Sequence, residues 1–141
     1  MPDFHFSHPI EVRYGDLDPQ GHVNNASFLT YFEQARIHYL AELGLINKRS
    51  SSFEVGIILA DAQVTYLAPV LFGMSLSIKV SVTRLGNKSM TMEYLMFDTA
   101  TGKELARGST VLVTFDYQKQ QSMPVPDDWR EKISAFENLS S

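Results

Sequence analysis

Residues 14–36 read YGDLDPQGHVNNASFLTYFEQAR, and this stretch decides the fold because it joins a polar turn directly to an amphipathic helix. Two acids, a proline and a glycine lie between Asp16 and Gly21, a composition that favours a loop over a strand or a helix interior. Asn24 and Asn25 are residue types that cap helix N-termini. The sequence therefore predicts a polar loop held against the positive end of a helix, where developing negative charge is stabilised. The apolar positions that follow at helical spacing are Phe28, Tyr31, Phe32, Ala35, Tyr39 and Leu40.

The helix is predicted to span residues 26–43, with Gly44 as its C-terminal stop. Its apolar residues cover roughly half of the helix circumference, which is more than a surface helix needs. We therefore expect a helix that is largely enclosed by a sheet. Arg36 falls inside the apolar arc and needs a carboxylate partner there, for which Glu33 and Asp16 are the candidates.

The composition is that of an ordinary globular domain of 141 residues, with 44% hydrophobic and 20% charged residues. The formal net charge is -4 and no run of Lys or Arg occurs, which argues against non-specific binding to nucleic acids or membrane surfaces. The absence of cysteine excludes disulfides, a thiol nucleophile and a zinc-thiolate site. No spacing of histidines and acids amounts to a metal site. Because the N-terminus lacks a signal-peptide pattern, we expect a cytoplasmic protein.

Alternating apolar residues predict an antiparallel β-sheet. Strands are expected at residues 9–14, 53–67, 74–84 and 105–117, with another carrying Met90, Met92, Tyr94 and Met96 on its apolar face. Residues 98–102 are predicted to form a hairpin connection, and residues 126–136 a short amphipathic helix. The expected order is one strand, one buried helix and a meander of four strands, which is an α+β class.

The side-chain faces predicted for two of these strands depend on this alternation. In the second strand we expect one face to contain five residues, and in the last strand we expect three to point inward, with Gly108 at a β-bulge. A single domain over residues 1–141 is expected, with an N-terminal arm at 1–8 and a C-terminal extension at 118–141. The residues expected on one face of the second strand are Ile58, Ala60, Ala62, Val64 and Tyr66, and the residues expected to point inward from the last strand are Val111, Val113 and Phe115.

The string DLDPQGHVNN at residues 16–25, followed by YFEQAR at 31–36, resembles the signature of hot-dog-fold acyl-CoA thioesterases, and most closely the 4-hydroxybenzoyl-CoA thioesterase type. YLAP at 66–69, FG at 72–73 and RLGNKS at 84–89 also fall where that family has a strand-ending proline, a turn glycine and a hairpin. The resemblance covers about residues 11–116. It implies a curved antiparallel sheet of about five strands wrapped around one long central helix, and dimers, often tetramers, formed through the sheet edges.

The resemblance also implies a set of site residues. The family's catalytic carboxylate matches Asp18, which would act as nucleophile or general base on the thioester. The oxyanion would meet a backbone N–H at the helix start, where the matching residue is Asn25. His22 occupies a position that varies between branches of the family, so it could orient Asp18, carry a proton or only shape the pocket. Val23 and Asn24 are implied to contact the substrate.

Two basic residues near the predicted 84–89 turn are candidates for contacting the phosphates of coenzyme A. These are Arg84 and Lys88, although a hairpin lysine is more often simply solvated. Asp16 is interpreted as a turn-forming acid, and Glu33 as an ion-pair residue. Another branch of hot-dog thioesterases uses a helix carboxylate, so Glu33 is a minor alternative for the catalytic acid. The resemblance implies no cofactor, since coenzyme A is part of the substrate.

The predicted function is hydrolysis of an acyl-CoA thioester by a homo-oligomer. One alternative is a thioesterase for fatty acyl or polyketide groups on acyl carrier protein; such an enzyme would favour a basic docking patch, which the acidic balance of the chain disfavours. A hot-dog hydratase would use an Asp/His pair, but the setting of Asp18 and His22 does not resemble the hydratase motif. A non-catalytic acyl-CoA-binding protein is the alternative outside enzymes; the regulators of that kind have a separate DNA-binding segment, for which the ten residues before the first strand leave no room.

Overall fold

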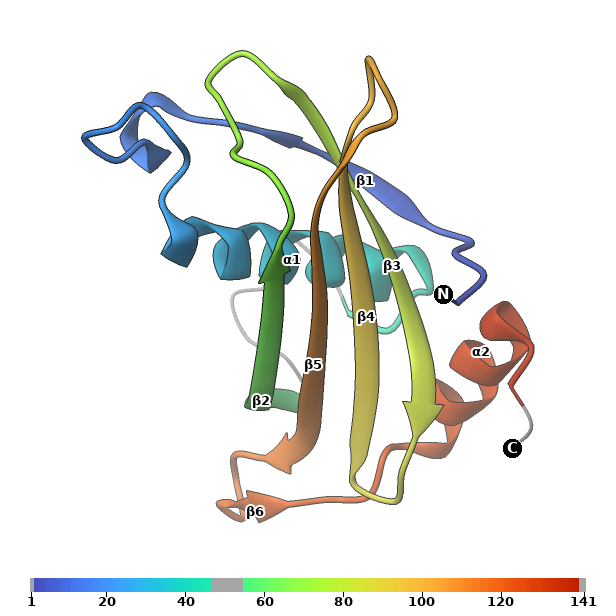
Figure 1. The fold of residues 1–141 in the computed structure, drawn as a ribbon. Coiled ribbons are helices and arrows are strands. Elements are labelled where there is room, and N and C mark those ends of the chain that lie inside the picture. The colour runs from blue at the N-terminus through green and yellow to red at the C-terminus, as the bar shows by residue number, and fades with distance from the viewer. Residues whose placement is uncertain (1, 47–54, 140–141) are drawn as a thin grey trace.

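The computed structural model describes residues 2–46 and 55–139, which form a curved antiparallel sheet around a long helix (Figure 1). The predicted α+β class is confirmed. No helix of the described residues is long and apolar enough to cross a membrane. The elements in chain order are β1 (Ser7–Glu11), the 3₁₀ turn η1 (Tyr14–Asp16), α1 (Asn25–Glu42), β2 (Gly56–Tyr66), β3 (Ser75–Leu85), β4 (Ser89–Asp98), β5 (Glu104–Asp116), β6 (Gln121–Ser122) and α2 (Asp127–Glu137).

The sheet does not follow the predicted four-strand meander. Its strand order is β1-β3-β4-β5-β2, with the short β6 paired to β5, so only β3, β4 and β5 form a meander. Strand β2 pairs with β5 instead of β3, and the chain then crosses the end of the sheet to begin β3 (Figure 1). Alternation in a sequence predicts a strand but not its partner, which is why β2 was misplaced. The consequence is that β2 is an edge strand.

Helix α1 lies across the concave face of the sheet (Figure 1) and buries its apolar side there, but its other side is exposed, so it is less enclosed than predicted. Phe32 and Tyr39 are completely buried, and the ring of Phe32 stacks on that of Tyr94 with centroids 4.8 Å apart. The apolar face predicted for β4 is confirmed, because its three methionines and Tyr94 are at most 2% exposed. The helix and the concave face therefore form one hydrophobic core.

The predicted inner face of β5 is wrong. Thr110, Leu112 and Thr114 are buried, whereas the valines and the phenylalanine that alternate with them are only half-buried on the outer face. Apolar residues occur on both faces of this strand, and the buried threonines are satisfied by hydrogen bonds, such as that between Thr110 and the Tyr94 hydroxyl (2.7 Å). The face of β5 that carries the threonines therefore faces the core. The prediction chose the other face because its residues are more hydrophobic.

Gly108 is not at a bulge, because it pairs in register with both Val64 and Tyr94. A Cβ at position 108 would overlap the ring of Phe32. Glycine is therefore required for the close approach of α1 to the sheet, which is one of the recognised uses of a strand glycine. The register shift of β2 against β5 lies instead between Leu59 and Asp61.

The predicted bounds of β1 and the predicted face of β2 also differ from the structure. Strand β1 starts at Ser7, inside the predicted N-terminal arm, and ends at Glu11. Tyr14, the predicted end of this strand, instead begins η1 and is 81% exposed. The residues predicted to share one face of β2 are only partly covered within the chain, since Ile58 and Tyr66 are 38% and 46% exposed. Phe53, the predicted start of this strand, lies outside the described residues.

Two buried charged groups connect the helices to the sheet. Arg36 is 6% exposed and pairs with Glu33 at 3.3 Å, as one of its two predicted partners, and it also donates to the Tyr94 hydroxyl. At the other end of the fold, Glu137 of α2 accepts hydrogen bonds from the Tyr39 hydroxyl (2.5 Å) and from the backbone N–H of Val82 (3.0 Å). This carboxylate holds the C-terminal helix against α1 and β3 at once.

Candidate functional site

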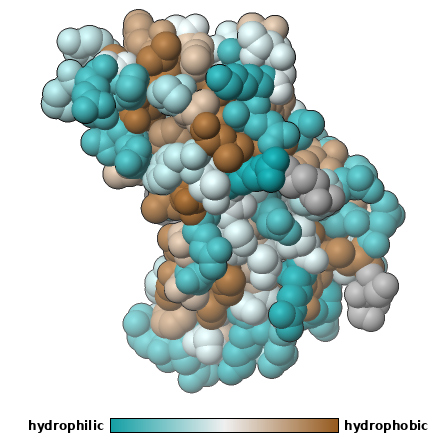
Figure 2. All heavy atoms as spheres, viewed as in Figure 1, coloured by the Kyte–Doolittle hydropathy of each residue, from teal (hydrophilic) through white to brown (hydrophobic). Residues whose placement is uncertain are grey.

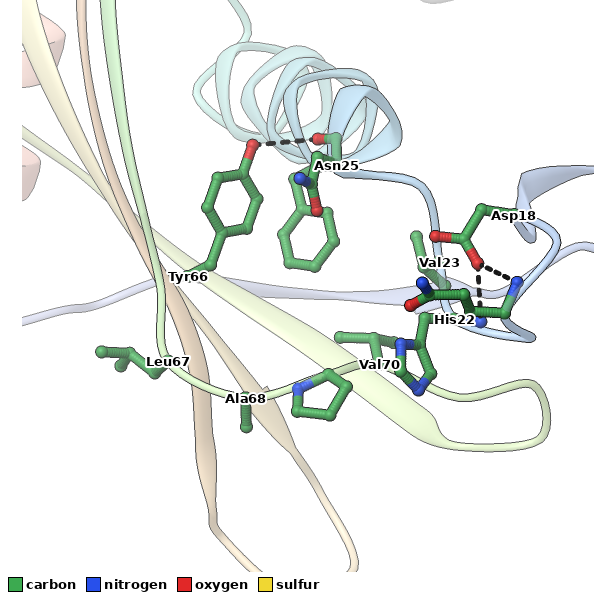
Figure 3. A pocket seen from close by; sticks show the side chains of 11 residues that line it. Asp18, His22, Val23, Asn25, Tyr66, Leu67, Ala68 and Val70 are labelled. Atoms are coloured by element: carbon green, nitrogen blue, oxygen red, sulfur yellow. Dashed lines mark hydrogen bonds between the residues drawn. The ribbon is translucent and has the colours of Figure 1, made fainter.

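Asp18 lies in a tight loop that leaves one of its carboxylate oxygens available. Its Oδ1 accepts the backbone N–H groups of Gln20 (2.9 Å) and His22 (3.2 Å), and its own backbone N–H donates to the carbonyl of His22 (2.7 Å). These are the local bonds that make aspartate a turn-forming residue. Among the described residues Oδ2 has no hydrogen-bond donor, and it is turned toward the cavity in Figure 3. The loop thus fixes the carboxylate while one oxygen stays open.

Asp16 has a structural role, as predicted from the sequence. Its buried carboxylate accepts the Tyr31 hydroxyl (2.6 Å), the backbone N–H of Arg13 (3.0 Å) and the Arg13 guanidinium (3.1 Å). Burial raises the pKa of Asp16, but its hydrogen bonds and the charge of Arg13 lower that pKa by more than burial raises it. The pKa of Asp16 therefore lies below its ordinary value. Burial and the bond to Asp16 raise the pKa of Tyr31. Asp16 therefore stays ionised and anchors the loop to α1.

The N-terminus of α1 presents one backbone donor without a partner. Asn24 is the N-cap, since its side chain accepts the N–H of Ala26 (2.9 Å), while its carbonyl accepts the N–H of Ser27 (2.9 Å). The N–H of Asn24 itself donates to the carbonyl of Asp16 (2.8 Å). Within residues 2–46 and 55–139, the N–H of Asn25 has no acceptor. This donor is at the positive end of the helix, where it is suited to bind a negatively charged oxygen.

A cavity of about 400 Å³ brings the acid loop and the helix start together (Figure 3). One wall is the loop and the first turn of α1, and the opposite wall is the end of β2 with the segment after it. The Tyr66 hydroxyl crosses between the two walls and donates to the carbonyl of Asn25 (3.1 Å). The lining residues are Asp18, Gln20, His22, Val23, Asn25, Phe28, Tyr66, Leu67, Ala68, Pro69 and Val70.

The sequence motif at residues 16–25 forms the polar part of this cavity, and most of the predicted site residues line it. Asp18, His22, Val23 and Asn25 line it, whereas Asn24 caps the helix beside it. Val23 is 3% exposed and its N–H donates to the carbonyl of Val70 (2.8 Å), which joins the motif to the opposite wall. The motif is therefore a structural unit as well as a source of polar groups.

His22 contacts Asp18 through its backbone. The hydrogen bond to the Asp18 carboxylate comes from the main-chain N–H of His22, while the imidazole lies on the Val70 side of the cavity in Figure 3. For the described residues, no hydrogen bond joins the imidazole to the carboxylate. Of the roles considered for His22, the geometry favours shaping the pocket over orienting Asp18 through the ring.

Arg84 and Lys88 do not approach the cavity of their own chain. Both are exposed near the β3–β4 turn, at the opposite end of the sheet from the loop that follows β2 (Figure 1). Strand β3 has 11 residues, so its two ends are separated by roughly 33 Å at about 3.3 Å per residue. A single chain therefore does not bring these two residues to Asp18.

The apolar wall was not among the predicted site residues, although the string at residues 66–69 matches the family pattern. The sequence did contain a signal for this wall. A strand that ends in Tyr-Leu-Ala-Pro places an aromatic residue next to a rigid turn. Hydrophobic atoms come to the surface at the upper end of the molecule, beside the loop after β2, as Figure 2 shows. Leu67, Leu71 and Phe72 are 46%, 43% and 58% exposed there.

This arrangement has the elements of acyl transfer. An available carboxylate oxygen can attack an electrophilic carbonyl or activate a water molecule, and an unpaired N–H at a helix start can stabilise the resulting oxyanion. The wall formed by the end of β2 and the residues after it is mainly apolar, which is suited to an acyl group. In the part of the chain that the structure describes, His, Asp and Glu side chains form no group of three or more able to hold a metal ion.

Comparison with known proteins gives a consistent result. Residues 12–133 match the model of the thioesterase-like superfamily. The chain is 26% identical over 128 residues to the long-chain acyl-CoA thioesterase FadM of Escherichia coli, covering 88% of this chain and 93% of FadM. It is 26% identical over 118 residues to the 1,4-dihydroxy-2-naphthoyl-CoA hydrolase of Thermosynechococcus vestitus, covering 82% and 80%. A Thermus thermophilus thioesterase, solved with coenzyme A and Zn, superposes with a TM-score of 0.80 at 35% identity and covers 99% of this chain and 100% of its own.

Proposed function

The chain belongs to the thioesterase-like superfamily, and on that premise we propose that it hydrolyses acyl-CoA thioesters to a free carboxylic acid and coenzyme A. The observation that carries the proposal is the pairing of two unsatisfied groups in one cavity. These are the Oδ2 atom of Asp18 and the backbone N–H of Asn25. The relatives named above, which act on acyl-CoA substrates according to their names, support the same reaction.

The proposed reaction uses water as the second substrate. Asp18 acts either as a general base, taking a proton from a water molecule that attacks the thioester carbonyl, or as a nucleophile whose acyl adduct water then hydrolyses. In both routes the carbonyl oxygen becomes an oxyanion opposite the N–H of Asn25. Collapse of the tetrahedral species breaks the C–S bond, and the thiolate leaves as coenzyme A after protonation. A donor of this type contributes about 10²- to 10³-fold to the rate of acyl transfer.

Thiol release from a panel of substrates tests the proposed function. The wild-type chain is expected to release free coenzyme A from at least one of short-chain, long-chain and aromatic acyl-CoAs, and the best substrate identifies the acyl class. Release only from acyl groups on acyl carrier protein would instead support a carrier-protein thioesterase. No release from either type would contradict a hydrolytic role, and retained acyl-CoA affinity would then identify a binding protein.

We also propose that two copies pair through the β2 edges. Within residues 2–46 and 55–139 no strand pairs with the outer side of β2, and Ile58 and Leu59 are 38% and 45% exposed on it. A two-fold axis perpendicular to the sheet pairs the two edges antiparallel. Because the cavity and the β3–β4 turn are at opposite ends of one chain, the pairing brings the partner's Arg84 and Lys88 to the cavity end of the combined sheet.

Mixing variants tests whether the two chains share a site. Asp18→Asn chains and Arg84→Ala/Lys88→Ala chains are each expected to hydrolyse acyl-CoA poorly alone. After unfolding and refolding together in equal amounts, half of the dimers are hybrids with one intact site of two, so activity should recover to about a quarter of wild type. An equal mixture without joint refolding is the control. If refolding together gives no recovery, the basic pair does not act across the interface.

A further inference from the structure

We infer that Tyr66 is a positioning residue for the proposed hydrolysis: its hydroxyl holds the first peptide groups of α1 so that the N–H of Asn25 faces the cavity. The hydroxyl donates to the carbonyl of Asn25 at 3.1 Å, and Tyr66 is 46% exposed at the end of β2. This inference rests on the proposed function, and it adds a residue that the motif at residues 16–25 does not contain.

The two peptide groups that flank Asn25 are both held by hydrogen bonds. The preceding residue, Asn24, is fixed on all sides: its N–H donates to Asp16, its carbonyl accepts from Ser27 and its side chain accepts from Ala26. On the following side, the carbonyl of Asn25 is held by the Tyr66 hydroxyl. The donor proposed to bind the oxyanion is therefore located in a turn held from both sides, and it is the unsatisfied N–H of that turn in the described structure.

The two restraints come from different parts of the fold. The first comes from the acid loop, through the carbonyl of Asp16, and the second comes from the far end of β2. Figure 3 shows Tyr66 reaching from its strand across to the start of α1, on the other side of the helix start from Asp18. The relative position of the Asp18 carboxylate and the Asn25 donor consequently depends on both restraints.

Packing restricts the tyrosine ring, so that its hydroxyl stays in place. The ring of Tyr66 meets that of Phe28 edge-on, with centroids 4.9 Å apart and an angle of 75°. Phe28 is 2% exposed and is the fourth residue of α1. The Tyr66 ring therefore packs on the same helix whose start its hydroxyl holds. A T-shaped pair of this kind is a favoured aromatic geometry. The ring contact and the hydroxyl bond together join the end of β2 to α1.

The effect on catalysis follows from the sensitivity of acyl transfer to donor position. A preorganised donor needs no reorganisation when the oxyanion forms, and a shift of about 1 Å at a reacting centre can cost about 10²-fold. Removing the hydroxyl leaves the donor present but less well held. We therefore expect a smaller loss than removal of the donor, and expect it in kcat, since the ground-state carbonyl does not need the full strength of the bond.

Tyr66→Phe tests this role while keeping the ring and its contact with Phe28. The variant is expected to lower kcat about tenfold, with KM and the affinity for an unreactive acyl-CoA thioether within about twofold of wild type. Thr99→Val is the matched control, because it also removes an exposed hydroxyl that donates to a backbone carbonyl, that of Ser75 at 3.0 Å, and Thr99 lies at the β4–β5 hairpin and does not line the cavity. A kcat within twofold of wild type would overturn the inference, as would equal losses in kcat and in analogue affinity.

Amide hydrogen exchange gives a second readout that needs no turnover. The N–H groups of Ala26 and Ser27 are protected by bonds to Asn24, so loosening of the first turn in Tyr66→Phe should speed their exchange relative to the rest of α1. Unchanged exchange would show that the hydroxyl does not hold the turn. Faster exchange in a chain that hydrolyses no thioester would instead contradict the proposed function and leave the structural role standing.

Discussion

The Asp18→Asn variant is expected to hydrolyse acyl-CoA about 10²- to 10⁴-fold more slowly than the wild-type chain. A positioned general base typically contributes a rate factor of this size. Asparagine keeps a side-chain oxygen to accept the backbone N–H groups of Gln20 and His22, so the loop should retain its shape. It lacks the charged second oxygen that faces the cavity. The loss should therefore appear in kcat, measured by thiol release, while acyl-CoA affinity changes little.

A matched control for this substitution is Asp98→Asn. Asp98 makes the same kind of local bond, since its Oδ1 accepts the N–H of Ala100 at 2.9 Å, but it lies at the β4–β5 hairpin. This variant should keep wild-type turnover. Near-wild-type kcat in Asp18→Asn would show that Asp18 is not the acid, and Glu33 on α1 would then be the carboxylate to replace next.

The Glu137→Leu variant is expected to lose about 2–5 kcal/mol of unfolding free energy, because two buried donors lose their shared acceptor and each unsatisfied donor costs about 1–3 kcal/mol. One donor is the Tyr39 hydroxyl and the other is the backbone N–H of Val82, both in the core. Burial and the bond to Glu137 raise the pKa of Tyr39, so the hydroxyl stays protonated and cannot escape the loss by ionising. Denaturant unfolding measures the effect.

Two variants separate the missing acceptor from other effects of the change. Glu131→Leu makes the same substitution at an exposed position of α2 and should change stability by less than about 0.5 kcal/mol. Glu137→Gln keeps an acceptor oxygen and should fall between wild type and leucine. If Glu137→Leu were as stable as wild type, the two hydrogen bonds would contribute nothing net, and apolar packing of α2 would account for its attachment.

The elements that were correctly predicted are those in which local chemistry and tertiary packing agree. The Asp16 to Asn25 string predicts a loop and a helix cap, and the apolar arc of α1 predicts which side of the helix is buried, because both depend on residues close together in the sequence. The pairing of Arg36 with Glu33 follows in the same way from a spacing of three residues. These features placed the polar half of the site before any tertiary contact was known.

The features that were missed depend on contacts between distant residues. The pairing of β2 with β5, the inward face of β5 and the reason for Gly108 each require knowledge of which elements meet. The Tyr66 hydroxyl and its acceptor are 41 residues apart, and no local pattern at either residue signals the other. The partial exposure of β2 was not signalled by the sequence either, because a strand shows the same alternation whether its apolar side is buried or partly exposed.

The bond between Tyr39 and Glu137 has a consequence for the synthesis of the chain, since its two partners are 98 residues apart. At about 5–20 residues per second, roughly 5–20 s pass on the ribosome between the addition of the tyrosine and that of its acceptor. During that time α1 has been made without the carboxylate that accepts its Tyr39 hydroxyl. A chain that ends before residue 137 lacks this acceptor, so α1 cannot complete its native hydrogen bonds until α2 has been synthesised.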